Sequence, residues 1–392
     1  MNFNMRNLLT TSLFFIFLIS CTFPRQAAPD VSGRAQNLWI SGYYPGWIQE
    51  KVPPSKIRMD AITHLFHFAA TVHADGTLSL SDFMLSDEHI QATVTVAHAA
   101  QKKVLLVLGG ANSGAGFRGA TSEANREKLI AGVVALVAKH GYDGIDLDWE
   151  PVLKGDNAQY TTFVQALHTA LKKHNDRALL TVATGPDPFG NPEVGKVYAQ
   201  LQEYFDQINL MTYVLLGAWP GWISWHGSPL YSGGLKFSNG RELPSVESNV
   251  ANFISAGVRK SKLGIGIAFH GDVWTGGNGT TAGGVTEPQQ KWEKPPTVKH
   301  DVAYSEIIAK YYAPEREHFD EVSQTPYLSL DQPGEHNDFF ISYSEVKAVS
   351  TRLKYMKEQG LGGCIIWHLG QDMLPTGQQP LAEAAAQFRV MH

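Results

Sequence analysis

Hydrophobic residues along the chain fall into short apolar runs, separated by longer stretches in which apolar positions recur every three or four residues. Short β-branched runs favour buried strands, and a spacing of three or four is typical of helices that cover one face of a sheet. The regular alternation of the two patterns predicts repeated βα units around a parallel sheet. Eight runs of the strand type can be counted, at 38–44, 62–70, 103–110, 143–149, 178–185, 207–213, 262–271 and 362–370.

Eight such units are the number that closes a (β/α)8 TIM barrel, so we predict an α/β fold of that class. The clearest helical stretches are 88–101, 122–141 and 157–174. Between His270 and Phe340 the periodic pattern is lost and turn residues dominate. We therefore predict a small insertion lobe at about 272–340, between strand 7 and strand 8. A long surface loop is the alternative, and loops of that length are uncommon unless they are functional.

The first residues of the chain predict export. Arg6 precedes a mostly apolar stretch at 8–20, which is shorter than the roughly 20 residues that span a bilayer. The stretch runs into Cys21 through Leu-Ile-Ser, a sequence that resembles the bacterial lipobox, in which the cysteine becomes the lipidated first residue. An ordinary signal peptidase cut near Ala27 or Ala28 is the alternative.

These features divide the chain into a lipoprotein-type signal peptide at 1–21, a linker at 22–36 and the barrel at 37–392. We expect a protein exported from a bacterial cell and anchored to a membrane through Cys21, or otherwise secreted or periplasmic. If Cys21 is lipidated, Cys364 is the remaining cysteine and no intrachain disulfide can form.

The composition narrows the class of partner. The chain has 392 residues, 43% hydrophobic and 18% charged, which is enough to bury a large core. Its net charge is only -5, without long runs of one sign, which excludes a nucleic-acid groove or a polybasic membrane patch. An uncharged substrate is therefore expected. Nine Trp, 14 Tyr and 19 Phe supply flat rings on which sugars stack, although core packing accounts for most of them.

Acidic and apolar residues alternate in the fourth strand-like run. Asp146, Asp148 and Glu150 should point into the barrel, while Ile145, Leu147 and Trp149 should face the helices. A low-polarity interior makes it costly to ionise three acids at once, so at least one proton should be retained. Glu150 is the last of the row, at the rim where barrel active sites lie. We predict that it donates a proton to a leaving oxygen.

The spacing of these acids also bears on the mechanism. A glycosidase with a protein nucleophile needs two carboxylates about 5 Å apart on opposite sides of the scissile bond, and neighbours on one strand cannot straddle a sugar in that way. A nucleophile on the substrate fits better, because an N-acetyl group can attack its own anomeric carbon if Asp148 orients the amide. Three carboxylates at strand ends also suit Mg²⁺, which stays an alternative.

The string DGIDLDWE at 143–150 resembles the DxxDxDxE signature of the family 18 glycoside hydrolases, the chitinases and their relatives. The resemblance extends over essentially the whole chain after the signal segment. The first-strand motif is matched by Gly42, Tyr43, Tyr44 and Trp47, the sixth-strand motif by Met211 and Tyr213, and the eighth-strand motif by Trp367.

This resemblance implies a hydrolase of β-1,4-linked N-acetylglucosamine polymers that retains anomeric configuration through an oxazolinium-type intermediate. Glu150 would act as acid and then base, Asp148 would orient the acetamido group, and Asp146 would support it electrostatically. Tyr213 would hold the acetamido oxygen. The residues implied to bind substrate are Asp143, Tyr43, Met211, Trp367 and Trp47, although Tyr43, Met211 and Trp367 also suit barrel packing. Neither a cofactor nor a metal is expected.

The chain departs from the family pattern at a few positions. Val107 stands where the family usually has Ser, and Val214 where it usually has Asp. The first change removes a hydrogen-bond partner of the inner acids Asp143 and Asp146, and the second removes a contact to the sugar. His270 and Asp272 replace residues that are more often aromatic and basic. We interpret His67 and His270 as core histidines whose ring nitrogens are hydrogen-bonded.

Other activities remain open within the same family. An endo-β-N-acetylglucosaminidase acting on glycans and a peptidoglycan-directed hydrolase share the acetamido requirement. A non-catalytic sugar-binding protein on this scaffold is a further alternative, which the presence of Glu150 disfavours.

Overall fold

The computed structural model describes residues 38–185, 193–332 and 338–391. The predicted signal peptide, the linker and Cys21 lie outside the described residues. Among the residues that are described, no helix has both the length and the apolar character needed to cross a membrane.

The chain forms a closed parallel barrel, which confirms the predicted (β/α)8 fold. Its strands follow the order β1-β14-β8-β7-β6-β5-β4-β2, and the pairing of β1 with β2 closes the ring. Each of the predicted runs overlaps one of these strands, and two of the strands extend one or two residues beyond their runs. They are β1 (Trp39–Pro45), β2 (His64–Val72), β4 (Lys103–Gly110), β5 (Gly144–Trp149), β6 (Leu179–Thr184), β7 (Gln207–Leu210), β8 (Leu263–Ala268) and β14 (Gly363–Trp367), with the short β3 (Leu78–Ser79) paired to β2.

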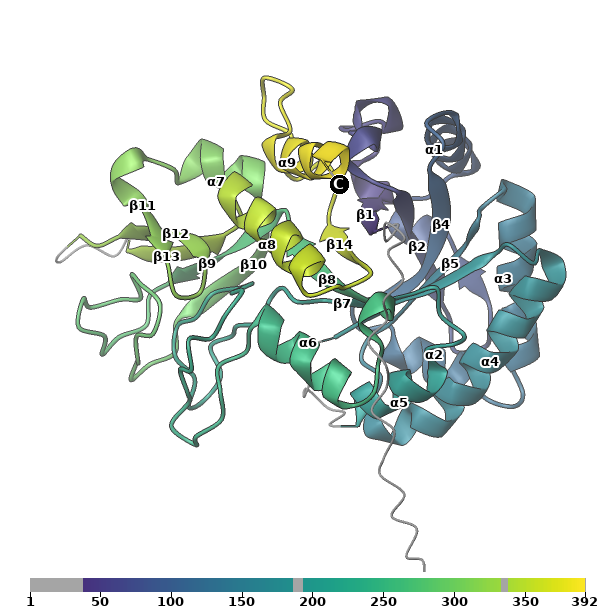
Figure 1. Ribbon diagram of the computed structural model, residues 1–392, viewed down its shortest axis with the longest axis horizontal. Coiled ribbons are helices and arrows are strands. Elements are labelled where there is room, and N and C mark those ends of the chain that lie inside the picture. The colour runs from purple at the N-terminus through teal and green to yellow at the C-terminus, as the bar shows by residue number, and fades with distance from the viewer. Residues whose placement is uncertain (1–37, 186–192, 333–337, 392) are drawn as a thin grey trace, which may run out of the picture. The chain divides into compact units, whose positions relative to one another are not determined.

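Helices cover the outside of the barrel, and α3 and α4 lie side by side (Figure 1). They are α1 (Asp87–Ala99), α2 (Gly114–Ala120), α3 (Arg126–His140), α4 (Asn157–His174), α5 (Val194–Leu201), α6 (Val246–Ser255), α8 (Val346–Glu358) and α9 (Pro380–Met391). Short 3-10 helices occur at Gly46–Ile48, Pro54–Lys56, Met59–Ala61, Ser81–Phe83, Lys154–Asp156, Lys260–Lys262 and Pro314–Arg316.

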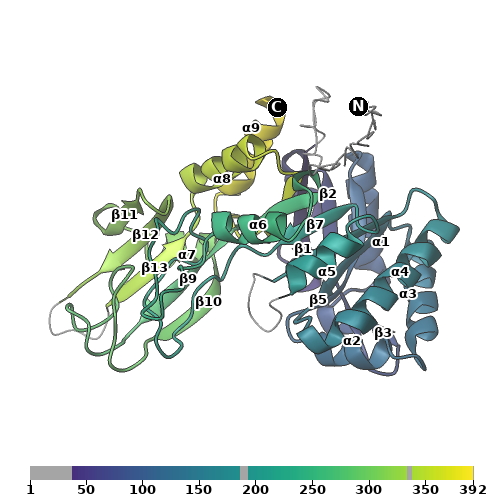
Figure 2. The ribbon, with the colours of Figure 1, turned by 60° about the horizontal axis from the view of Figure 1, so that its bottom comes forward.

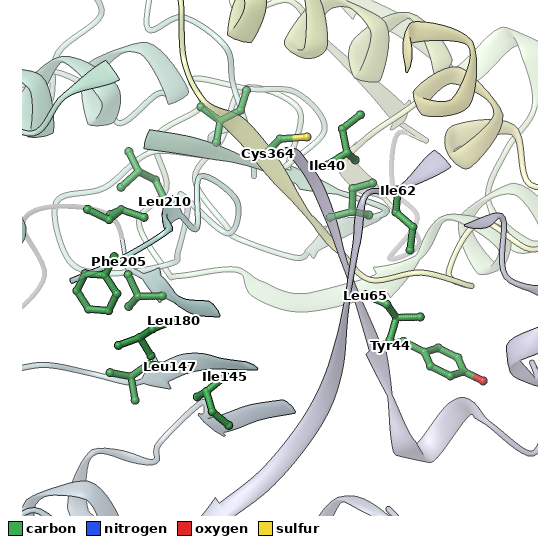
Figure 3. Close-up of a cluster of buried hydrophobic side chains, with 14 of the residues drawn as sticks. Ile40, Tyr44, Ile62, Leu65, Ile145, Leu147, Leu180, Phe205, Leu210 and Cys364 are labelled. Carbon is green, nitrogen blue, oxygen red and sulfur yellow. The ribbon is translucent and has the colours of Figure 1, made fainter. Parts of the chain in front are cut away.

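The outward faces of the strands pack against these helices and form the main core. Ile145 and Leu147 of β5 are fully buried there beside Phe163 and Leu167 of α4. Figure 3 shows part of this layer, with side chains from β1, β2, β5, β6, β7 and β14. Since burying a large apolar side chain stabilises the fold by about 1.5–3 kcal/mol, this layer holds the barrel closed.

In the sequence, a second sheet is inserted between β8 and β14, which are the seventh and eighth strands of the barrel. The predicted insertion lobe between strand 7 and strand 8 is therefore confirmed. Its antiparallel strands follow the order β10-β9-β13-β12-β11, and Figures 1 and 2 show them with α7 beside the barrel. Only Phe269 separates β8 from β9, so the predicted run 262–271 is divided between the two sheets. The bounds are β9 (His270–Thr275), β10 (Thr297–Ala303), α7 (Tyr304–Lys310), β11 (Glu317–Asp320), β12 (Thr325–Leu330) and β13 (Phe339–Tyr343).

Glycine is required at position 144, at the start of β5, because the backbone of β6 lies too close for a side chain. A Cβ at this position would lie 2.0 Å from the carbonyl oxygen of Leu179 on β6. We expect Gly144→Ala to lower the free energy of unfolding by about 2–3 kcal/mol, because backbone on both sides must shift. Urea unfolding followed by circular dichroism measures this difference.

Gly155 provides the matched control, because a Cβ there would meet no atom within 4 Å. Gly155→Ala should change the free energy of unfolding by less than about 1 kcal/mol. Equal denaturation midpoints for the two variants would contradict the packing argument.

Candidate active site

The acidic row on β5 points into the barrel, as predicted. Asp146 and Asp148 are buried, and Glu150 follows directly after the strand. Ile145, Leu147 and Trp149 belong instead to the outer core against the helices.

Asp146 is the deepest of the three acids and is held by two hydroxyl groups. Tyr43 Oη donates to one carboxylate oxygen at 2.7 Å, and Thr181 Oγ1 donates to the other at 2.6 Å. Burial raises the pKa of Asp146 to about 6, and these two hydrogen bonds act in the opposite direction. Val107 pairs with Asp146 from β4 and Thr181 pairs with it from β6, so Thr181 supplies a hydrogen bond although Val107 cannot.

Asp148 and Glu150 form a carboxyl pair. Burial, followed by the charges of Glu150 and Asp146, raises the pKa of Asp148 well above its usual range. Burial also raises the pKa of Glu150, while the hydrogen bond from Asp148 lowers it. Both directions follow because a low-polarity site disfavours two neighbouring negative charges. Both shifts favour the protonated form of a carboxyl in this pair, more strongly for Asp148 than for Glu150.

The end of β5 is fixed by the loop that follows β4. Ser113 Oγ accepts from the Glu150 amide at 3.0 Å and donates to the Asp148 carbonyl at 3.1 Å. The Gly114 amide donates to the Glu150 carbonyl at 2.8 Å. Gly109 has φ 103°, and a Cβ there would lie 2.2 Å from the Asp148 carbonyl oxygen, so only glycine permits this approach. These contacts hold the backbone of Asp148 and Glu150 in place.

A cavity of about 520 Å³ opens above the acids. The predicted binding residues Tyr43, Trp47, Met211, Tyr213 and Trp367 all line it together with Asp148 and Glu150. The Trp367 ring lies 5.3 Å from that of Tyr43 and 5.0 Å from that of Phe68, centroid to centroid. The remaining lining residues are Phe68, Phe83, Ala111, Gly185, Val214, His270 and Asp301. The cavity thus joins a carboxyl pair to an aromatic wall.

Asp143 does not belong to this cavity, and its predicted role in substrate binding is wrong. Its carboxylate accepts from Lys103 Nζ at 2.7 Å and from the Val104 amide at 2.9 Å, and it contacts His98 Nε2 at 2.8 Å. These partners lie at the amino-terminal end of the barrel, where Asp143 joins β4 to β5. Asp143 was also wrongly counted among the inner acids that lose a hydrogen-bond partner at Val107, because Val107 lies level with Asp146 while Asp143 bonds Lys103 and Val104.

The two histidines interpreted as core residues differ from one another. His67 bonds Gln49 and Tyr142 through its two ring nitrogens, as predicted. His270 is 2% exposed, yet neither of its ring nitrogens has a hydrogen-bond partner among the described residues. Its interpretation as a hydrogen-bonded core histidine is therefore wrong.

Val214 lines the cavity with a left-handed backbone, φ 54°. This conformation is tolerated by Gly, Asn and Asp but is strained for a β-branched residue. The replacement of the usual Asp by Val214 thus leaves an apolar and strained position in the cavity wall.

Several site residues were not predicted from the sequence. Thr181 could have been found, because it lies on the inward face of β6, level with Asp146. Ser113 reaches Glu150 from a loop, and Asp301 reaches the cavity from an irregular part of β10. Neither position is marked by a periodic pattern in the sequence.

In the described ranges, no group of three or more His, Cys, Asp or Glu side chains is arranged to hold a metal ion. The row on β5 therefore does not show the cluster that the magnesium alternative needs.

Comparison with known proteins places these features in a wider context. Residues 40–372 match the profile of the glycosyl hydrolases family 18. A probable endochitinase of Caenorhabditis elegans is 27% identical over 86% of this chain and 56% of its own length. Chitinase A1 of Niallia circulans is 30% identical over 67% of this chain and 39% of its own length. The chain thus spans about half or less of these two relatives.

Solved structures of similar fold cover nearly all of the chain. A family 18 N-acetylglucosaminidase from Paenibacillus barengoltzii superposes with a TM-score of 0.74 at 24% identity, over 90% of this chain and 100% of the other. A Group IV chitinase from Ostrinia furnacalis in complex with allosamidin gives 0.76 at 22% identity, over 91% and 99%. These likenesses support the barrel with its lobe.

The raised pKa of Asp146 predicts how stability depends on pH. The folded protein holds this proton up to about pH 6, whereas the usual pKa of the carboxyl is 3.8. The contribution to stability is therefore complete below about pH 4 and is lost as the pH rises through 6. The Asn side chain of Asp146→Asn does not titrate. The fall in the free energy of unfolding between about pH 4 and pH 7 should therefore be smaller in this variant by up to about 3 kcal/mol. Urea unfolding at pH 4, 5, 6 and 7 tests this, and parallel curves for both proteins would contradict it.

Proposed function

The chain belongs to the glycosyl hydrolases family 18, and we propose that it hydrolyses β-1,4-linked N-acetylglucosamine polymers with the substrate's own acetamido group as nucleophile. The observation that carries the proposal is the Asp148 and Glu150 pair at the cavity that Tyr213 and Trp367 also line. Relatives at modest identity are named as chitinases, which supports chitin or chito-oligosaccharides as the substrate class.

Sugar binding would begin on the aromatic wall. Trp367 offers an apolar ring against which a pyranose face can stack, next to Phe68 and Tyr43. Burial keeps the pKa of Tyr213 well above its usual range, so its hydroxyl stays a donor for the acetamido oxygen. This geometry would place the N-acetyl group above Asp148.

The bound acetamide would then change which acid of the pair is protonated. Its N–H donates to Asp148 and stabilises the ionised form of that carboxylate. A proton on the pair is then held by Glu150, the residue nearer the rim. Asp146 keeps both of its oxygens bonded to hydroxyl groups, so it contributes negative potential without competing for the acetamide.

In the first chemical step the acetamido oxygen attacks the anomeric carbon as the glycosidic bond breaks. Glu150 gives its proton to the leaving oxygen, and the oxazolinium ion that forms is stabilised by the Asp148 carboxylate. In the second step Glu150, now ionised, takes a proton from water. The water oxygen bonds to the anomeric carbon and the acetamide is restored.

The alternatives differ in substrate or in turnover. An endo-β-N-acetylglucosaminidase and a peptidoglycan-directed hydrolase would use the same acids on other chains, and a non-catalytic protein would bind without cleavage. Glu150 and the raised pKa of the carboxyl pair favour an enzyme. Export and membrane anchoring through Cys21 are part of the same proposal, because such polymers lie outside the cytoplasm.

Glu150→Gln tests the acid directly. The amide keeps the shape of the side chain but has no acidic proton to give to the leaving oxygen, so turnover of a chitin hexamer should fall by about 10³-fold or more. Calorimetric affinity for the same hexamer should change by less than about tenfold. Glu123→Gln, on an exposed turn, is the control and should keep full activity. Undiminished hydrolysis by Glu150→Gln would refute the assignment.

The stereochemistry of the product tests the nucleophile. Two successive displacements at the anomeric carbon must give net retention, so the first product seen by proton NMR should carry the β configuration. A substrate without the N-acetyl group on the cleaved sugar should not be hydrolysed. An initial α product would exclude the acetamido mechanism even if Glu150 is essential.

A further inference from the structure

His270 lines the cavity, and its two buried ring nitrogens have no hydrogen-bond partner among the described residues. Its ring lies edge-on to that of Tyr213, with 5.8 Å between the centroids. The distance from Nδ1 to the nearest carboxylate oxygen, on Asp301, is 3.9 Å, which is too long for a hydrogen bond. Since buried polar groups are nearly always paired, a polar group of a ligand is the natural partner for this ring.

Asp301 is brought to the same wall by an irregularity in the lobe. The pairing of β10 with β9 shifts between Lys299 and Val302, and Asp301 in this bulge has φ 56°. Bulges turn a side chain away from the direction that regular pairing would give it. Gln371 Nε2 donates to Asp301 Oδ1 at 2.7 Å and holds the carboxylate in place. Among the described residues the second oxygen has no hydrogen-bond partner, and the side chain is 43% exposed.

The charge of the cavity has one sign. Three acids line it, Asp148, Glu150 and Asp301, and within the described part of the chain neither Lys nor Arg is found in the lining. Like charges a few ångströms apart in a partly buried site weaken binding by about tenfold to a hundredfold. A ligand with a carboxylate therefore meets repulsion on two sides of this cavity.

We propose that His270 and Asp301 form a specificity wall that binds a hydrogen-bond-donating group of the sugar, a hydroxyl or an ammonium, and that excludes sugars carrying a carboxylate. This inference rests on the proposed function and names its substrate class. The substrates are chitin-type polymers, including partly deacetylated ones, and the N-acetylmuramic acid strands of peptidoglycan are rejected.

The two side chains complement these groups chemically. An imidazole nitrogen is a donor when it carries a proton and an acceptor when it does not, whereas an ionised carboxylate offers only acceptors. A hydroxyl can donate to Asp301 and accept from His270, and an ammonium can donate to both. A carboxylate can only accept, so it would leave Asp301 facing a like charge.

The first test is an internal competition on partly deacetylated chitin oligomers, with products sequenced by mass spectrometry. Wild type should cleave preferentially where glucosamine occupies one fixed position beside the cleaved unit. Asp301→Asn should lower this preference about tenfold, because a charge-assisted hydrogen bond is lost. Glu315→Gln, an exposed acid of the same lobe outside the cavity, should leave it unchanged. Identical product sequences for wild type and Asp301→Asn would overturn the role of Asp301.

The second test separates activity from folding at His270. His270→Phe keeps a ring beside Tyr213 and removes both unpaired nitrogens, so Tm should stay equal or rise. The kcat/KM for a fully acetylated hexamer should fall about tenfold, mainly through KM. An unchanged kcat/KM, or a loss that follows a lower Tm, would overturn the role of His270.

The third test addresses the excluded class. Peptidoglycan glycan strands should be cleaved at least about tenfold more slowly in the acid form than after methyl esterification of their lactyl groups. Equal rates for both forms would overturn the electrostatic exclusion. Failure of wild type on the fully acetylated hexamer would instead refute the proposed function, whatever the variants do.

Discussion

Burial of a row of carboxyl groups on a single strand is the constraint around which this molecule is built. Charge that is removed from water must be paired, protonated or opposed by donors. Asp146 receives two hydroxyl donors, and burial raises the pKa of both Asp148 and Glu150. The loop through Ser113 then holds the strand end in place. The same burial and hydrogen bonding that make these acids compatible with the barrel interior also set their proton affinities at the cavity.

The two sheets have separate tasks in this arrangement. The barrel supplies the acids, the hydroxyl groups of Tyr43 and Tyr213 and the aromatic wall, all from strand ends or the segments that follow them. The lobe supplies His270 and Asp301 on another side of the same cavity. Substitutions in β9 or β10 therefore leave the β5 row itself unchanged, and the contact of His270 with Tyr213 connects the two parts of the site.

Periodicity was sufficient to predict the barrel, since every strand of the ring overlaps a predicted run. Alternation along β5 likewise predicted which side chains face inward. Asp143 was misplaced because the spacing of a motif does not show where each residue lies along the strand. Asp143 precedes the start of β5, whereas Glu150 follows its end. The position of Thr181 beside Asp146 depends on the register between β5 and β6, and the position of Asp301 at the cavity depends on a bulge in β10. Such contacts arise from pairing between distant segments, which a one-dimensional pattern does not encode.

The passage from β8 to β9 through Phe269 alone has a mechanical consequence. One nearly continuous strand connects the barrel wall beside Tyr213 to the lobe wall that carries His270, and a strand held by neighbours on both sides bends little. No loop intervenes at which the two walls could swing apart. The barrel and the lobe are thus joined closely at this point, and under the proposed function a polymer would adapt its own conformation to the opening.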